Sequence, residues 1–140
     1  MVNYIKTNKL FFICLTIIFI SSFLASLVQT SFGNVSIELK SLKTDNGQTL
    51  VYDLYRPKLA DSSTKVPFVV VVPGFQRSKE TLSNIAIELS RRGIVAISID
   101  PYAQGGSSSS MSRRAATKEG YGMFALVDYI YNTNNLNYKK

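Results

Sequence analysis

Two continuously apolar segments on either side of a helical pattern constrain the fold of this chain more than any other feature. Residues 66–72 read VPFVVVV and residues 93–100 read GIVAISID, and neither segment alternates between apolar and polar side chains. Strands with this composition are buried on both faces, as in a parallel sheet covered by helices. The sequence therefore predicts a β–α–β unit over 66–100 and an α/β fold class.

The helix expected between these strands has recognisable signals at both ends. Ser78 is a favourable N-cap, and Glu80 lies in the first turn, where the helix dipole favours negative charge. Gly93 can adopt the left-handed conformation that often follows the last helical turn. The spacing i, i+3, i+4, i+7 predicts one buried stripe, made of Leu82, Ile85, Ala86 and Leu89.

The β–α–β unit is flanked by a predicted hairpin and a second predicted helix. Residues 35–57 alternate between apolar and polar on two arms, and Asp45-Asn46-Gly47 supplies a turn in which Asn and Gly tolerate positive φ. The Gly- and Ser-rich segment 105–110 is predicted to be a loop, either flexible or hydrogen-bonded. A helix is predicted over 117–131 and a loop from residue 132 onward. The expected buried face of this helix comprises Ala125, Leu126, Tyr129 and Ile130.

An uncharged apolar segment lies close to the N-terminus. Residues 10–28 are just long enough for a membrane-spanning helix, which needs about 20 residues. An uncleaved anchor over 10–29 and a cleaved signal peptide both fit this segment, and a soluble core helix is a third interpretation. The length of the segment and the lack of an A-x-A cleavage site favour the anchor.

The basic residues around this segment predict its orientation. Lys6 and Lys9 precede it, and no basic residue follows until Lys40. By the positive-inside rule, residues 1–9 are predicted to be cytoplasmic and residues 30–140 to lie outside the cytoplasm. The prediction is a single-pass membrane protein, or a secreted one if the segment is cleaved.

The charges and the rare residue types exclude several classes of function. Sixteen Lys and Arg residues oppose nine Asp and Glu residues, but the basic residues are scattered and no aromatic residues interleave with them. Nucleic-acid binding is therefore not predicted. Cys14 is the only cysteine and there is no histidine, so no intrachain disulfide and no Cys-based metal site can form. We expect no cofactor and no metal.

The turn between the first buried strand and the helix reads PGFQRSKE and contains one glycine, Gly74. A phosphate-binding turn at this position would need G-x-G-x-x-G or G-x-x-x-x-G-K-[ST], and neither pattern is present. This argues against a nucleotide-binding Rossmann domain.

Three motifs together resemble the N-terminal portion of the α/β-hydrolase superfamily, in particular its dienelactone hydrolase and acyl-peptidase-like branches. Residues 69–76, VVVVPGFQ, resemble the third strand and the oxyanion turn of that family. Residues 78–100 resemble the first helix and the fourth strand, and residues 100–108, DPYAQGGSS, resemble the loop that follows. The resemblance covers 35–140, and residues 30–140 are expected to form part of such a domain.

The resemblance implies a role for the turn in acyl transfer. In the family, backbone N–H groups stabilise the negative charge that develops on the substrate carbonyl oxygen, and one of them comes from this turn. Phe75 would supply that donor, with Gln76 as a weaker candidate, and Gly74 would allow the sharp turn. Pro73 stands where many relatives have His. The alternative interpretation is that Pro73-Gly74 only ends a strand.

Two requirements of the family mechanism are missing from these 140 residues. The sequence has neither a G-x-S-x-G motif nor a histidine, and Asp100 and Asp128 precede the position of a triad acid. The family order places a fifth strand and the nucleophile after the second helix. The resemblance therefore implies the N-terminal fragment of a membrane-anchored serine hydrolase for a small ester or peptide, inactive alone. It also implies that residues 69–72 form an exposed sheet edge, because the fifth strand would cover them.

Two other functions remain open at this point. The chain could be a complete, non-catalytic, membrane-anchored α/β interaction domain. It could also be a peripheral module that uses its net charge of +7 to bind lipid.

Overall fold

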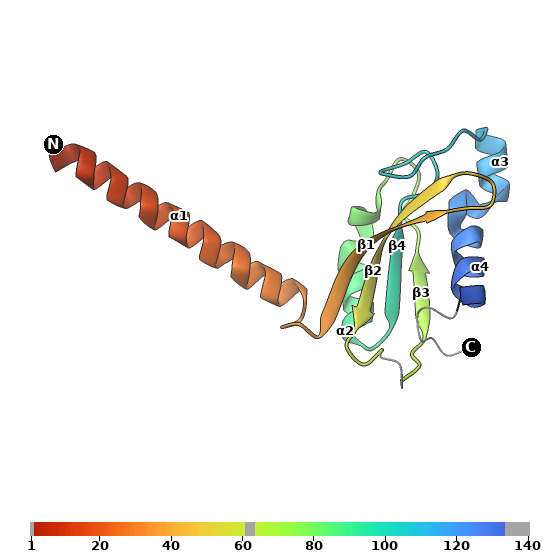
Figure 1. Cartoon of the computed structure of the whole chain (residues 1–140), viewed down its shortest axis with the longest axis horizontal. Coiled ribbons are helices and arrows are strands. Elements are labelled where there is room, and N and C mark those ends of the chain that lie inside the picture. The colour runs from red at the N-terminus through yellow and green to blue at the C-terminus, as the bar shows by residue number, and fades with distance from the viewer. Residues whose placement is uncertain (1, 61–63, 134–140) are drawn as a thin grey trace.

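The computed structural model describes residues 2–60 and 64–133 (Figure 1). A long helix, α1 (Val2–Gln29), extends away from the rest of the molecule. Its part from Asn8 to Gln29 is long and apolar enough to cross a membrane, and a signal sequence near an N-terminus has the same properties. None of its most apolar window is buried inside the structure, which excludes the core-helix interpretation.

In the rest of the described chain, four strands form a sheet in the order β1-β2-β4-β3. Strands β1 (Val35–Lys43) and β2 (Thr49–Pro57) form the predicted antiparallel hairpin, and Val35 pairs with Pro57. Strand β4 (Val95–Ile99) lies antiparallel to β2 and parallel to β3 (Phe68–Val71). The predicted hairpin, the β–α–β unit and the α/β fold class are therefore confirmed.

The two strands predicted to be buried on both faces differ in burial. Every residue of β4 is buried, because β4 lies between β2 and β3. Within residues 2–60 and 64–133, strand β3 has a strand neighbour on one side only, and Val69 is 38% exposed. The prediction of full burial was wrong for β3, whereas the prediction of an exposed edge is confirmed at Val69 and Val72.

In the hairpin turn between β1 and β2, the role of Asn46 differs from the prediction. Gly47 has a positive φ of 80°, but Asn46 does not. The side-chain oxygen of Asn46 instead accepts hydrogen bonds from the Gln48 N–H and the Thr44 hydroxyl. Asn46 therefore stabilises the turn through its side chain rather than through its backbone conformation.

The predicted crossover helix begins as a 3-10 turn, η1 (Lys79–Leu82), and continues as α2 (Ser83–Arg91). Ser78 occupies the N-cap position of η1, but its side chain makes no capping hydrogen bond. The predicted stripe was wrong at Ile85, which is exposed, whereas Ala86 and Ser90 are buried. The 3-10 turn has fewer residues per turn than the α-helix, so one periodicity does not describe both parts.

The C-terminal end of α2 agrees with its prediction. Gly93 has a φ of 85°, its N–H donates to the Ser90 carbonyl, and the Ile94 N–H donates to the Leu89 carbonyl. This pair of hydrogen bonds is a Schellman motif, in which glycine takes the left-handed position.

The second predicted helix is divided into α3 (Arg113–Lys118), the 3-10 turn η2 (Gly120–Gly122) and α4 (Met123–Thr133). The prediction of one helix over 117–131 was wrong, because all three residues of η2 have positive φ. Gly122 also contacts the core closely, and a Cβ there would lie 2.7 Å from Leu50 Cδ1. The loop expected from residue 132 lies mostly outside the described residues.

Helices α2 and α4 cover opposite faces of the sheet (Figure 1). On the α4 face, Leu126 and Ile130 pack in a core with Ile97 and Ile99. On the α2 face, Ala86 packs against a smaller core that contains Ala96. Alternate residues of β4 thus enter different cores, which explains why its sequence is apolar without a period of two.

Candidate functional site

The candidate site lies at the carboxyl ends of β3 and β4. These strands are parallel, so residues 72–78 and 100–112 leave the sheet at the same end. Helix α1 joins the sheet at the opposite end, where β1 begins at Val35 (Figure 1). Carboxyl ends of parallel strands are the common location of binding sites in open α/β sheets.

Asp100, directly after β4, connects the two segments. Its side chain is buried, Oδ1 accepts a hydrogen bond of 2.7 Å from the Lys79 N–H, and Oδ2 accepts one of 2.8 Å from the Gly106 N–H. A Cβ on Gly105 would lie 2.2 Å from Asp100 Cγ, and Gly105 has a φ of 53°. The close approach of the backbone to this carboxylate therefore requires glycine at position 105.

The serine-rich segment is hydrogen-bonded to the edge of β2. The Ser107 hydroxyl donates to the Asp100 carbonyl at 2.7 Å and accepts from the Val51 N–H at 2.8 Å. The Ser108 hydroxyl accepts from the Thr49 N–H at 3.0 Å. Of the two alternatives predicted for this loop, the hydrogen-bonded one is confirmed.

The turn after β3 has free backbone donors. Phe75 and Gln76 are exposed, and neither of their N–H groups donates a hydrogen bond within residues 2–60 and 64–133. The Arg77 N–H, in contrast, donates to Gln104 Oε1 at 2.9 Å. The left-handed residue is Gln76, with a φ of 58°, rather than Gly74, which has no positive φ and no close neighbour. The role predicted for Gly74 in the turn was therefore wrong.

Both candidate donor residues line a cavity of about 570 Å³ between the turn, the loop after β4 and α3. None of its other lining residues is predicted as a binding residue from the sequence, although several belong to the turn and to segments 78–100 and 100–108, which carry the family resemblance. These residues are Arg77, Ser78, Tyr102, Ala103, Gln104, Gly105, Ser109, Met111, Arg113, Ala116 and Tyr121. Arg113 is one of the scattered basic residues of the sequence, and no pattern around it predicts a cavity.

Arg113 reaches from α3 to the turn after β3. Its guanidinium carbon lies 4.5 Å from the centre of the Phe75 ring, a cation–π distance. The Thr117 hydroxyl donates a hydrogen bond of 3.0 Å to the Tyr121 hydroxyl, and this bond, followed by the nearby Arg113, lowers the pKa of the partly buried Tyr121 phenol. Arg113 thus contacts the Phe75 ring at the cavity, and Tyr121 lines the same cavity.

A partly buried ion pair supports the start of η1. Lys79 Nζ lies 3.2 Å from Asp53 Oδ2 on β2, and both side chains are largely buried. Burial lowers the pKa of Lys79, but its hydrogen bonds to Glu80 and Asp53 outweigh burial and leave that pKa raised. The Lys79 and Ser78 hydrogen bonds lower the pKa of Glu80 to about 2. This pairing attaches the segment after the turn to the sheet.

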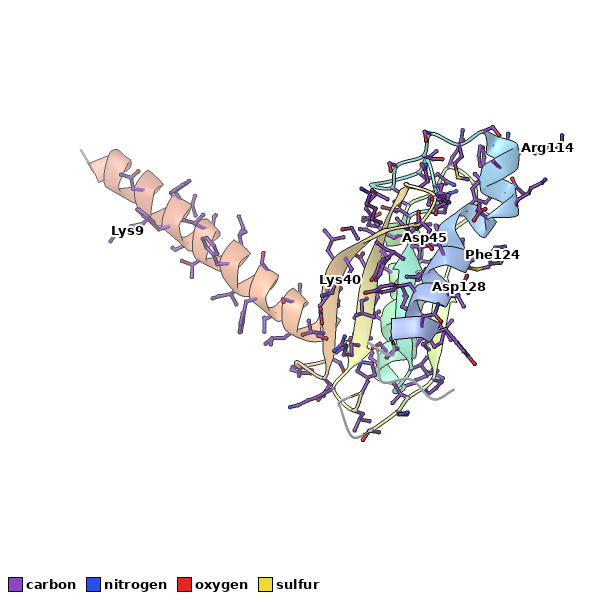
Figure 2. All side chains as sticks on the ribbon, turned by 45° about the vertical axis from the view of Figure 1, so that its right-hand side comes forward. Lys9, Lys40, Asp45, Arg114, Phe124 and Asp128 are labelled. Carbon is purple, nitrogen blue, oxygen red and sulfur yellow. The ribbon has the colours of Figure 1, made fainter. Side chains whose placement is uncertain are left out.

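A second cavity, of about 630 Å³, lies between the hairpin turn and α4. Asp45 from the turn and Asp128 from α4 are among its lining residues, as is Phe124 (Figure 2). In the part of the chain that the structure describes, no three His, Cys, Asp or Glu side chains are grouped as metal ligands.

Comparison with solved structures shows what this arrangement resembles. A hypothetical protein from Pseudomonas aeruginosa matches 74% of this chain with 26% identity and a TM-score of 0.60. The α/β hydrolase GrgF from Penicillium sp. sh18 matches 70% with 21% identity and a TM-score of 0.56. The esterase Pf2001 from Pyrococcus furiosus matches 75% with 15% identity and a TM-score of 0.58. The chain carries part of an α/β-hydrolase fold.

The chain spans 33%, 33% and 40% of the lengths of these three structures, respectively. No family model matches the sequence, and the search of curated proteins found no match. The superfamily relationship is thus supported at the level of the fold. Its dienelactone hydrolase branch stays a prediction.

Proposed function

We propose that residues 30–140 form one part of a serine hydrolase for small esters or amides. In this proposal the Phe75 N–H contributes to the oxyanion hole, and the Gln76 N–H is the weaker candidate. The nucleophilic Ser and the His come from outside these 140 residues. The observation that carries the proposal is the pair of free N–H groups at a cavity at the carboxyl end of β3.

The physical basis is the hydrogen-bonding state of the turn. A backbone N–H that no protein acceptor uses remains available to a developing oxyanion, and loss of one such donor lowers kcat by about 10² to 10³-fold. The supporting residues around the turn are fixed, because Lys79 and Gly106 both donate to Asp100. A fixed support keeps the donor positioned before the reaction begins.

The proposal includes the membrane topology. Residues 1–9 remain in the cytoplasm, residues 10–29 cross the membrane as an anchor, and residues 30–140 lie outside. Because the cavity is at the sheet end opposite to Val35, it would lie about 30 Å from the anchor junction, the length of the nine-residue strand β1. N-terminal sequencing of the mature protein tests the anchor, since a cleaved signal would remove the apolar segment together with the residues before it.

The decisive experiment uses the coding DNA beyond residue 140. We expect a strand and a G-x-S-x-G motif within about 20 residues, followed by an Asp and a His. A stop codon without such a continuation in any frame would overturn the proposal.

Two variants of Phe75 in the extended protein test the donor. Phe75→Pro removes the backbone N–H and Phe75→Ala keeps it, so both variants lose the ring but only Phe75→Pro loses the donor.

We expect Phe75→Pro to lower kcat on a p-nitrophenyl ester by about 10² to 10³-fold relative to Phe75→Ala. Unfolding midpoints of both variants must agree for this comparison to hold. Equal kcat values in two folded variants would show that the Phe75 N–H is not an oxyanion donor.

Residues 69–71 of β3 have a neighbouring strand on one side only among the described residues, which favours a second candidate, a non-catalytic anchored interaction domain that binds an extended segment. Val69 and Val72 are partly exposed along this edge, which would promote aggregation if nothing covered it. We expect residues 30–140 expressed alone to be poorly soluble and inactive on p-nitrophenyl esters. A monodisperse, cooperatively unfolding monomer would instead support the second candidate.

A further inference from the structure

A third cavity, of about 480 Å³, lies at the end of the sheet where helix α1 joins it, opposite to the candidate site (Figure 1). Its lining contains two basic residues, Lys58 and Arg91, and no Asp or Glu. Lys58 is exposed and forms no ion pair among the described residues. Arg91 lies 3.7 Å from Glu88, a carboxylate that Arg92 contacts more closely, at 3.0 Å. The cavity therefore has a positive potential.

The position of Arg91 relative to a membrane follows from its contact with α1. Arg91 Nη2 donates a hydrogen bond of 2.6 Å to the Val28 carbonyl, and Val28 is the last residue of the uncharged apolar segment. The 19 residues of that segment, 10–28, span about 28 Å as a helix, close to the hydrocarbon thickness of about 30 Å. If α1 crosses the bilayer, the Arg91 guanidinium therefore lies at the boundary between hydrocarbon and headgroups, where the lipid phosphates are.

Hydrogen bonds fix the junction between α1 and the sheet. The Phe32 N–H donates to the Leu27 carbonyl at 2.7 Å, and the Lys58 N–H donates to the Asn34 carbonyl at 2.8 Å. Together with the bond from Arg91 to α1, these contacts attach the end of β2 and the end of α2 to the connection between α1 and β1. Both basic residues are thus held close to the end of the apolar helix.

Exposed apolar side chains lie in the same part of the molecule. Phe32, between α1 and β1, is 74% exposed, and Leu59, which lines the cavity, is 68% exposed. Surfaces that lie on a bilayer combine apolar side chains, which enter the boundary between headgroups and acyl chains, with Lys and Arg side chains, which contact anionic lipids. Phe32 and Leu59 beside Lys58 and Arg91 provide this combination.

We propose that this cavity binds the phosphate of an anionic membrane lipid, with Lys58 and Arg91 as the contacts. The inference rests on the membrane anchor of the proposed function and not on its hydrolase chemistry. Arginine has five N–H donors, so the bond to the Val28 carbonyl leaves others for phosphate oxygens. An anionic headgroup is favoured over a zwitterionic one, because the lining has no carboxylate to pair with a headgroup cation.

A titration of the full 140-residue chain in non-ionic detergent micelles tests this inference. The probes are dioctanoyl phosphatidylglycerol, which is anionic, dioctanoyl phosphatidylcholine, which is zwitterionic, and inorganic phosphate, which has no acyl chains. Binding at the cavity is followed by the NMR shifts of the Arg91 and Gly93 amides. We expect phosphatidylglycerol to bind about tenfold more tightly than phosphatidylcholine. Inorganic phosphate should bind more weakly than phosphatidylglycerol, because no acyl chains hold it at the micelle surface.

Two pairs of matched substitutions locate the site. Arg91 and Arg92 are adjacent and both contact Glu88, but only Arg91 lines the cavity. Arg91→Gln should therefore remove most of the preference for phosphatidylglycerol, whereas Arg92→Gln should keep it. Because Arg91 also bonds to α1, a second pair leaves that contact intact. Lys58→Gln should reduce the preference about threefold, and Lys65→Gln, at an exposed lysine outside the cavity, should not. An unchanged amide spectrum elsewhere shows that each variant is folded.

Three results would overturn the inference. They are equal affinity for the two lipids, equal lipid preference in Lys58→Gln and Lys65→Gln, and binding of inorganic phosphate as tight as that of phosphatidylglycerol, which would indicate a soluble ligand. Failure of the proposed function gives a different outcome. If no nucleophile is encoded after residue 140, the hydrolase proposal fails and the lipid preference is unaffected. If the preference is absent and sequencing finds the apolar segment retained, the anchor stands and only the lipid site is lost.

Discussion

The loop after β4 and the turn after β3 lie side by side at one end of the sheet but differ in how their polar groups are used. In the loop, the carboxylate of Asp100 and the hydroxyl of Ser107 each make two hydrogen bonds. In the turn, the N–H groups of Phe75 and Gln76 make none within the described parts of the chain. The satisfied loop is therefore a structural support, and the turn that it holds is where a ligand can bind.

The largest expected effect of a substitution in the loop is at Gly105. In Gly105→Ala the new Cβ would displace the Asp100 carboxylate, and the left-handed φ would add strain, so we expect a loss of about 4 kcal/mol of unfolding free energy. Gly47→Ala is the matched control, because Gly47 also has a positive φ but a Cβ there would have no atom within 4 Å. We expect Gly47→Ala to lower the unfolding free energy by about 1 kcal/mol. Denaturant unfolding in detergent measures both, and similar losses would contradict the support role of Asp100.

A smaller effect is expected at Ser107. Ser107→Ala removes a donor and an acceptor from a buried position and leaves the Val51 N–H without its partner, which costs about 2 kcal/mol. Ser109→Ala, in the same run of serines, loses only an acceptor for the Met111 N–H and should cost about 0.5 kcal/mol. If thermal unfolding shifts both variants equally, the segment is not attached to β2 in the way described.

The unfolding free energy should depend on pH through Glu80, which lies in the segment that follows the turn. Hydrogen bonds from Lys79 and Ser78 lower the pKa of Glu80 to about 2. A lowered folded pKa stabilises the protein above the unfolded value of 4.5, and this stabilisation is lost as the pH falls from there toward 2. Because the side chain is exposed, we expect less than about 1 kcal/mol from it.

Glu80→Gln should flatten this part of the stability curve between pH 5 and pH 2. Glu88→Gln, which removes an exposed ion-pairing carboxylate on α2, provides the comparison. The two variants should differ in the slope of unfolding free energy against pH. Identical slopes would show that Lys79 does not distinguish Glu80 from an ordinary surface carboxylate.

The smallest effect on stability is expected in the turn itself. Phe75 is 59% exposed, and Phe75→Ala removes mainly its contact with Arg113, so unfolding free energy should change by no more than about 0.5 kcal/mol. A loss of stability comparable with that of Gly105→Ala would mean that the turn is structural rather than functional.

The elements that sequence analysis predicted well are those with a local cause. The hairpin and the end of α2 at Gly93 follow from alternation and turn chemistry, which neighbouring residues determine. The incorrect details arise where local patterns meet a tertiary constraint. Helix 117–131 is broken at η2 because Gly122 must approach Leu50, a residue 72 positions away in sequence. No periodicity within the helix contains that information.

The candidate site likewise has one part that the sequence predicts and one part that it does not. The location of the turn after β3, and with it Phe75 and Gln76, followed from a strand and a helix separated by Pro-Gly and from a family resemblance. The cavity could not be predicted, because Arg113 reaches Phe75, and Tyr121 joins the cavity lining, only after α3 and η2 fold over the end of the sheet. Their chemistry depends on distances between segments that are more than 30 residues apart.

The amino-acid sequence by itself determined the apolar helix near the N-terminus, the β–α–β unit and the absence of histidine, since these depend on composition and short-range order. The tertiary structure alone decided which polar groups are satisfied. Asp100 and Ser107 use their hydrogen-bonding capacity within the protein, whereas the N–H groups of Phe75 and Gln76 have no acceptor among the described residues. Hydrogen bonding depends on distance and direction in space, which the order of residues does not specify.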